Sequence, residues 1–388
     1  MLKLEECWAN IWAIGSPPKN NHFLRMSFFS FQNQPIDLKN NAFDFMRLAL
    51  ALLVVISHTQ TLGLFGMEPN LQITDFRFFY DGLVTVGGFA VYSFFVISGF
   101  LITGSWLNSN NDLVLFAKKR LVRIVPAYWV ALVIISLLFL PFGFLLQGGN
   151  LVSYYQQYFV KSLGFIFKNA LFDINLWGID GLFSVEGDGG NTIDGPIWTI
   201  RYELYAYILI AVFGLLGFLK DSRKLIGLFF AFWAAYVALV FAPGFRDGLS
   251  NVFNDLWWIP LCTYFFAGSL FYFFKDKIGW NFKLFSFSLL VVICGLISNL
   301  FALVGPIFFG FVILYLSLRL PIRNLTRNFG DYSYGIYIYS WPIQKLLTIA
   351  GLNQLGLIPY GLLSVGLSLG AGYLSWNLVE KKFLKHKA

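Results

Sequence analysis

The sequence predicts an all-α fold, a polytopic bundle of about ten transmembrane helices with both chain ends in the cytoplasm. Three observations support this prediction. The 388 residues are 57% hydrophobic and only 12% charged. The apolar residues form stretches long enough to cross a bilayer, and the lysines and arginines gather between alternate stretches.

The composition excludes most other classes of protein. Ordinary globular proteins are roughly 45–50% apolar and about 25% charged, whereas this chain has 45 Phe residues and a mean hydropathy of +0.67. Disordered chains and disulfide-rich domains are excluded on the same grounds. The three cysteines (Cys7, Cys262 and Cys294) have no metal-binding spacing, and no metal is expected.

A transmembrane helix needs roughly 17–25 predominantly apolar residues. Ten stretches approach this length, at 43–65, 83–103, 124–146, 196–218, 225–242, 256–274, 284–302, 304–320, 331–350 and 357–378. We expect each of them to form a helix. In the last one, Gly366 and Gly370 have the four-residue spacing that predicts a close helix-packing seam.

Lysine and arginine set the orientation. With the N-terminus inside, 21 of the 28 basic residues fall in cytoplasmic segments or, like Arg319, at the cytoplasmic end of a span, and four fall in outer segments. The other three, Arg47, Arg201 and Lys345, fall within spans. This bias follows the positive-inside rule. The net charge of +8 is therefore a topology signal, and no nucleic-acid partner is expected.

This topology divides the chain into three parts. They are a cytoplasmic N-terminal extension (1–42), a transmembrane domain (43–378) and a basic cytoplasmic tail (379–388). The long outer loop at 147–195 contains two glycine pairs and five acidic residues. It is interpreted either as a solvated connector or as an ordered loop above a site.

Ionisable residues within a span are costly unless they are paired or hydrated, so they mark candidate sites. Arg47 and His58 are eleven residues apart in the first span, which is within about 20° of three full helical turns. Both side chains therefore share one face and are separated by roughly 16 Å along the axis. Arg47 would lie near the cytoplasmic end and His58 in the outer half. An anchoring arginine and a hydrogen-bonded histidine are the structural alternatives.

The fourth span holds a carboxylate that is predicted to reach the same depth as His58. Glu203 lies about eight residues inside the outer edge of its span, as His58 does in its own. A carboxylate that accepts one ring N–H would orient His58 and raise its basicity, as expected for a general base. A purely structural ion pair involving Glu203 is the alternative.

Arg120 and Arg123 stand three residues apart at the cytoplasmic entry to the third span, on one face of a helix. Ordinary positive-inside charge would explain them. Alternatively, they form a phosphate site, because guanidinium groups bind phosphate in bidentate fashion. Together with Arg47, they predict a phosphate-bearing donor held at the inner face, with His58 and Glu203 deeper in the bundle.

In these residues and their spacing, the chain resembles the integral membrane acyltransferase family 3. The resemblance covers residues from about 41 to 383 and depends on six segments in the right order. These are Arg47 with His58 (the family's Arg-x10-His motif), Phe94–Thr103, Arg120–Trp129, Trp198–Glu203, Asp331–Tyr339 and Trp376–Glu380. One departure is Ser340 before Trp341-Pro342, where many relatives have His.

The resemblance implies ten membrane helices and an O-acyltransferase that moves acetyl from acetyl-CoA to a carbohydrate hydroxyl. The acceptor would be an exopolysaccharide, O-antigen or similar glycan, and the location a bacterial inner membrane. By their match to the motifs, His58 and Glu203 would be catalytic, and Arg47, Arg120 and Arg123 would bind the donor. His58 would act as a base or an acyl relay.

Two other functions fit the same residues. Histidine, glutamate and arginine inside a bundle also describe a proton-coupled transporter, although we find no internal repeat of the kind that transporters usually carry. A non-catalytic component of a glycan export or assembly complex would make His58 and Glu203 dispensable.

Overall fold

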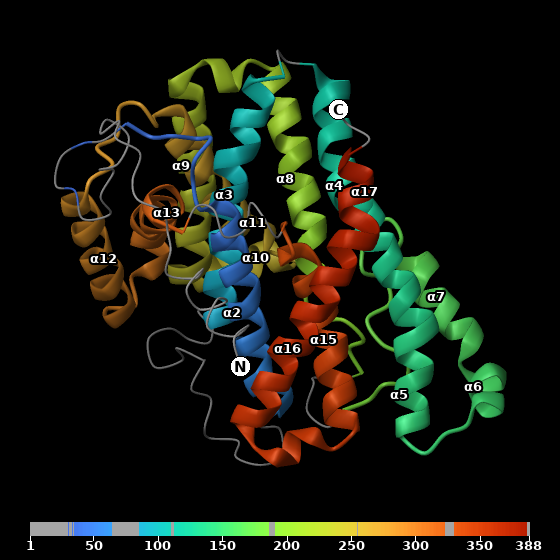
Figure 1. Cartoon of the computed structure of the whole chain (residues 1–388). Helices are drawn as coiled ribbons and strands as arrows, with labels where there is room; N and C mark the ends of the chain where they lie inside the picture. Colours follow the sequence, from blue (N-terminus) through green and yellow to red (C-terminus); the bar gives the residue numbers. More distant parts are fainter. Residues whose placement is uncertain are drawn as a thin grey trace, which may run out of the picture.

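The computed structural model describes residues 30, 33, 35–63, 85–109, 112–185, 191–253, 255–322 and 330–385. These residues form a bundle of helices and contain no β-strand, only two isolated bridges in the outer loop (Figure 1). The fold class predicted from the sequence is confirmed. Most of the predicted N-terminal extension lies outside the described residues.

Each predicted apolar stretch contains a long helix. The helices are α2 (Phe43–Gly63), α3 (Val86–Leu107), α4 (Leu113–Ile134) with η2 (Ile135–Phe139) and α5 (Leu140–Leu146), α8 (Trp198–Leu215), α9 (Ser222–Phe241), α11 (Trp258–Phe273), α12 (Phe282–Ile297), α13 (Phe301–Arg319), α15 (Ser333–Ile349) and α16 (Leu357–Ser375). Seven helices in the described residues are long and apolar enough to cross a membrane. Because α11, α12 and α15 are shorter, the count of ten crossings and the side of the termini stay predictions.

Two helices extend beyond the predicted spans. The third begins at Leu113 and runs through the π-helical η2 to Leu146, so the basic segment that includes Arg120 and Arg123 is helical. The last continues from α16 through η5 (Trp376–Glu380) into α17 (Lys381–Lys385). The boundary predicted at 378 therefore falls inside a continuous helix.

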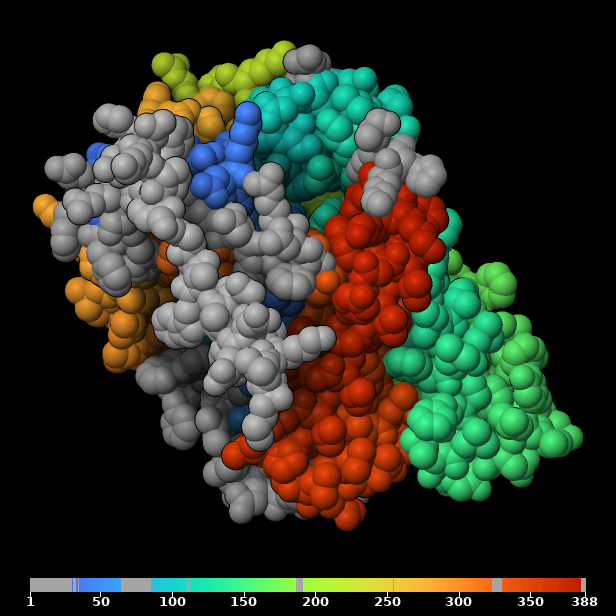
Figure 2. Space-filling model, viewed as in Figure 1, coloured from blue at the N-terminus to red at the C-terminus, as the bar shows by residue number. Residues whose placement is uncertain are grey.

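The outer loop is partly helical and folds back on the bundle. It contains α6 (Leu151–Gln157) and α7 (Phe159–Asn169). Tyr128 and Trp129 of α4 donate hydrogen bonds to the carbonyls of Asn169 and Ala170, over 2.8 and 2.9 Å. With α5, these helices stand out from the rest of the molecule at the lower right (Figures 1 and 2).

Helix starts follow from local capping. The side chains of Thr85, Asp112 and Asn281 each accept a hydrogen bond from a backbone N–H in the first turn of α3, α4 and α12, respectively. Such caps satisfy backbone donors that have no partner within the helix. Short elements complete the chain, at η3 (Phe218–Lys220), α10 (Pro243–Ser250) and η4 (Leu352–Leu355).

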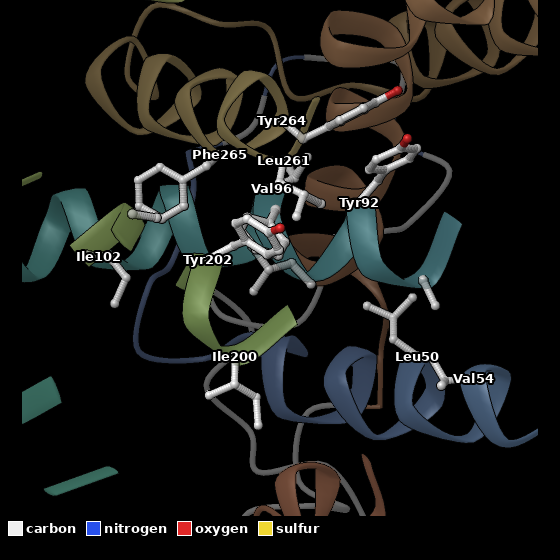
Figure 3. Packing of buried hydrophobic residues seen from close by; sticks show 14 of the residues in the cluster. Leu50, Val54, Tyr92, Val96, Ile102, Ile200, Tyr202, Leu261, Tyr264 and Phe265 are labelled. Atoms are coloured by element: carbon white, nitrogen blue, oxygen red, sulfur yellow. The ribbon is translucent and has the colours of Figure 1, made fainter. Parts of the chain in front are cut away.

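Helix α3 lies at the centre of the bundle, between α2 and α11 (Figure 3). Two glycines allow α3 and α11 to approach closely. A Cβ atom on Gly99 would lie 1.8 Å from the carbonyl oxygen of Phe265, and one on Gly268 would lie 2.1 Å from that of Val96. The seam predicted at Gly366 and Gly370 is wrong for contacts within the chain, because both glycines face open space.

Candidate active site

A cavity of about 90 Å³ lies between α2, α3, α4, α8 and α15. This is room for several water-sized molecules, since one needs ~10–15 Å³. Three of its lining residues are charged, namely Arg47, Arg123 and Glu203. The others are Val91, Phe94, Phe95, Ser98, Ile124, Thr199, Ile200, Ser333, Tyr334 and Tyr337. Three of the five site residues predicted from the sequence therefore meet at one cavity.

A buried carboxylate joins the two arginines of this cavity. Asp331, just before α15, accepts a hydrogen bond from Arg47 at 3.4 Å and forms an ion pair with Arg123. The backbone N–H of Ser333 donates to its other oxygen, at 3.3 Å, and the Ser333 hydroxyl does too. Asp331 is only 7% exposed, so this pairing offsets the cost of burying its charge.

Arg120 lies beside the cavity rather than in its wall. Its guanidinium donates to the hydroxyl of Ser105 on α3 at 3.2 Å, while its Nε is buried without a partner among the described residues. It is within electrostatic range of Glu203 and of both cavity arginines. The structure thus brings Arg47, Arg120 and Arg123 into one basic cluster.

Glu203 faces this cluster from α8. The hydroxyl of Tyr207, one turn further along the helix, donates to its carboxylate. The three guanidinium groups have four carboxylates within electrostatic range, those of Asp331, Glu203, Asp44 and Glu380. Guanidinium groups bind carboxylate and phosphate oxygens alike, so an anionic ligand would compete with these carboxylates for the three arginines.

His58 lies further along α2, toward the end of that helix that is followed by Gly63. Its ring meets the indole of Trp341 on α15 edge to face, with centroids 4.9 Å apart. Its Nδ1 atom is buried and has no hydrogen-bond partner among the described residues. The preceding residue, Ser57, accepts a hydrogen bond from the backbone N–H of Gly87 at 3.1 Å and fixes α2 against the start of α3.

The hydrogen bond expected between Glu203 and His58 is not formed between these described residues. Counting from span edges placed both side chains at one depth, but α8 begins deeper in the bundle than that count assumed. Thr199, in its first turn, pairs with Tyr337 at 2.7 Å. Glu203 lies four residues, or about 6 Å, beyond Thr199 along α8. Trp341, which contacts His58, lies four residues beyond Tyr337 along α15, in the opposite direction. Glu203 and His58 are therefore separated along the helix axes.

The outer loop closes over the histidine end. The carbonyl oxygen of Thr192 accepts hydrogen bonds from the Trp341 indole at 3.2 Å and from the Lys345 ammonium at 2.7 Å. Gly195 packs so tightly on this indole that an added Cβ would lie 3.0 Å from it. The intramembrane Lys345 thus anchors a loop, and at least this part of the outer loop is ordered above a candidate site.

Arg201, the third ionisable cation within the predicted spans, points away from the cavity. It forms ion pairs with Asp173 of the outer loop at 3.1 Å and with Asp255 before α11. This places Arg201 with the outer surface groups rather than with Arg47 and Arg123.

Sequence reasoning missed several residues of the site. Asp331 stands in a segment that carries the family resemblance, but its role as the partner of two arginines depends on residues more than 200 positions away. Thr199 and Tyr337 also stand in segments that carry the resemblance, but nothing in the sequence singled them out, because Thr and Tyr are common in membrane helices. No group of three His, Cys, Asp or Glu that could hold a metal occurs in the described part of the chain.

Comparisons with known proteins bear on this geometry. The family model described as "Acyltransferase domain" (Acyl_transf_3) matches residues 40–376. An "O-acetyl transferase" of Shigella phage Sf6 is 30% identical over 359 residues, 89% of this chain and 96% of the relative. "Nodulation protein 10" of Rhizobium leguminosarum bv. viciae is 25% identical over 371 residues, 89% of this chain and 93% of the relative. No solved structure matches the chain.

Proposed function

The chain belongs to the acyltransferase family whose model matches residues 40–376, and by that relation it is a membrane O-acyltransferase. On this basis we propose a donor and an acceptor for its reaction. The donor is acyl-CoA, with acetyl-CoA as the first candidate, and it arrives from the cytoplasm. The acceptor is a carbohydrate hydroxyl on the outer or lipid-linked side of a bacterial inner membrane. The observation that supports this most is a cavity lined by two arginines, with His58 eleven residues beyond Arg47 on the same helix.

The donor phosphates are assigned to the arginine cluster. Arg47 and Arg123 line the cavity, and Arg120 stands beside it. Planar guanidinium groups match phosphate oxygens in pairs. Bound phosphate would draw Arg47 and Arg123 away from Asp331, or share them with it, because both arginines are paired with that carboxylate in the structure.

His58 is proposed to act on the acceptor hydroxyl. As a base it takes the hydroxyl proton while the hydroxyl oxygen attacks the thioester carbonyl carbon. The carbon–sulfur bond then breaks, and the proton on His58 passes to the departing thiolate, so that an ester and free CoA are formed. The buried Nδ1 atom has no described partner, which leaves it able to exchange a proton. His58 as an acyl relay is the alternative within the same reaction.

Glu203 is retained as a site residue with a changed role. Its carboxylate lines the cavity, accepts from Tyr207 and faces the arginine cluster. We propose that it sets the position and charge balance of these arginines around the donor. Direct orientation of His58 would require a movement of α8 relative to α2.

Membranes that contain the protein, incubated with acetyl-CoA labelled in the acetyl group, test this function. An O-acyltransferase moves the label into the carbohydrate fraction and releases one free CoA for each ester formed. A transporter or an assembly component transfers no label above the level of membranes without the protein. That result would overturn the proposed function.

A further inference from the structure

Asp194, in the outer loop just before α8, is a buried acidic residue that the mechanism above does not use. It is 1% exposed, and neither carboxylate oxygen has a hydrogen-bond partner among the described residues. Asp331, the other buried aspartate of this region, is by contrast bonded to two arginines and a serine. Asp194 is therefore the exception that requires an explanation.

An unpartnered buried carboxyl group lowers stability. Burial of a polar group without a hydrogen bond costs on the order of 1–3 kcal/mol in proteins, and burial of an unpaired charge costs more. Burial also raises the pKa of Asp194 well above its usual range, which favours the protonated form. A protonated carboxyl group both donates and accepts hydrogen bonds, as sugar hydroxyls do.

Hydroxyl groups close to Asp194 form no hydrogen bond with it, and two of them are engaged elsewhere. Tyr128, Tyr337 and Tyr339 are within electrostatic range of its carboxyl group. Tyr128 donates to the carbonyl of Asn169 at 2.8 Å. Tyr337 pairs with Thr199 at 2.7 Å, and the Thr199 hydroxyl is also 3.2 Å from the carbonyl of Pro196.

Asp194 is connected through its neighbours to the cavity wall and to the histidine. Tyr337, which is within electrostatic range of Asp194, lines the cavity together with its partner Thr199. On the other side of Asp194 in the chain, Gly195 lies against the indole of Trp341, and that indole meets the ring of His58. One short segment of the loop thus connects the unpartnered carboxyl group with the proposed base.

We propose that Asp194, with the hydroxyls of Thr199 and Tyr337, forms the acceptor subsite and binds hydroxyl groups of the sugar unit that receives the acyl group. The ligand class is a pyranose ring with neighbouring hydroxyls, of which one reaches His58. The proposal rests on the O-acyltransferase function given above and adds where the acceptor lies. It assigns Asp194 to the acceptor and leaves the donor to the arginine cluster.

The test measures acceptor and donor separately. The probe for the acceptor is alkali-treated surface glycan from cells that lack the gene, added at rising concentration to purified protein with labelled acetyl-CoA. Asp194→Ala should raise the KM for this glycan about tenfold, the loss expected for about one hydrogen bond. The KM for acetyl-CoA and the Kd of CoA should stay within twofold. The side-chain amide of Asp194→Asn still donates and accepts hydrogen bonds, so the glycan KM of this variant should lie between the values of the wild type and Asp194→Ala.

Asp247→Asn is the matched control, because Asp247 is an exposed aspartate in the outer helix α10. Tyr337→Phe should repeat the rise in glycan KM with donor binding intact. An unchanged glycan KM in Asp194→Ala and Tyr337→Phe, beside an active wild type, would overturn the subsite alone. If Asp194→Asn weakened CoA binding as much as glycan binding, the subsite would also be overturned, since Asp194 would then have a structural role. A wild type that transfers no label would overturn the proposed function itself.

Discussion

Replacement of Gly99 by alanine tests the packing that holds the central helix in place. Gly99 lies in α3, next to Ser98, which lines the cavity. The added methyl carbon would lie 1.8 Å from the carbonyl oxygen of Phe265, whereas ordinary contacts begin near 3.4 Å. The two helices would have to separate by about 1.6 Å at this point, because neither partner atom belongs to a flexible side chain.

Overpacking of this kind typically costs about 1–3 kcal/mol, and a contact with rigid backbone places Gly99→Ala at the upper end. The assay is thermal unfolding of the purified protein in detergent, with Gly366→Ala as control. Gly366 is also within a helix but has open space beside it. We expect a melting temperature lowered by several degrees for Gly99→Ala and unchanged or slightly raised for Gly366→Ala. Equal melting temperatures in the two variants would refute the close contact between α3 and α11.

Two further predictions concern the arginine cluster. Asp331→Asn leaves Arg47 and Arg123 without their buried anionic partner and should lower the free energy of unfolding by about 3–5 kcal/mol. Asp276, whose side chain is 75% exposed, pairs with Lys275, and Asp276→Asn should change the free energy of unfolding by less than about 1 kcal/mol. Similar changes in Asp331→Asn and Asp276→Asn would contradict the pairing of Asp331 with the arginines. Arg120→Ala should raise the KM for acetyl-CoA about 10–100-fold, the loss of a charged hydrogen bond, and the loss should shrink as salt rises. The exposed Arg223→Ala is its control, and an unchanged KM in Arg120→Ala would remove that residue from the donor site.

The apolar stretches and the basic residues between them were sufficient to predict the helices. Each predicted stretch contains a helix, with ends displaced mostly by a few residues. The larger error, at the start of the third helix, has a physical cause. Hydropathy detects only the apolar part of a helix. Leu113–Arg123 is the basic first part of α4, and its start is capped by Asp112, whose side chain accepts a hydrogen bond from the backbone N–H of Leu115.

The grouping of the site was predicted in part. Arg47, Arg123 and Glu203 share a cavity because each is an ionisable residue that a membrane protein places in its interior. Contacts across the bundle were beyond prediction, since depth counted from span edges ignores how far each helix is shifted along its neighbours. The pairing of Thr199 with Tyr337 and of Asp331 with the arginines shows this shift.

Glycine spacing was a poor guide to packing for the same reason. Gly366 and Gly370 have the right spacing for a seam but have open space beside them among the described residues, whereas Gly99 and Gly268 come from different helices and each lies against the backbone of the other helix. A spacing motif identifies a smooth helix surface and gives no information on whether a neighbour lies against it.

The most direct test of the whole account is acetyl transfer by His58→Ala in membranes supplied with labelled acetyl-CoA. Base catalysis contributes about 10²–10⁴-fold, so label transfer to glycan should fall by that factor while CoA still binds at the arginine cluster. Ile56→Ala, at a 47% exposed position of the same helix, should transfer label at the wild-type rate. Transfer by His58→Ala at the wild-type rate would contradict the account.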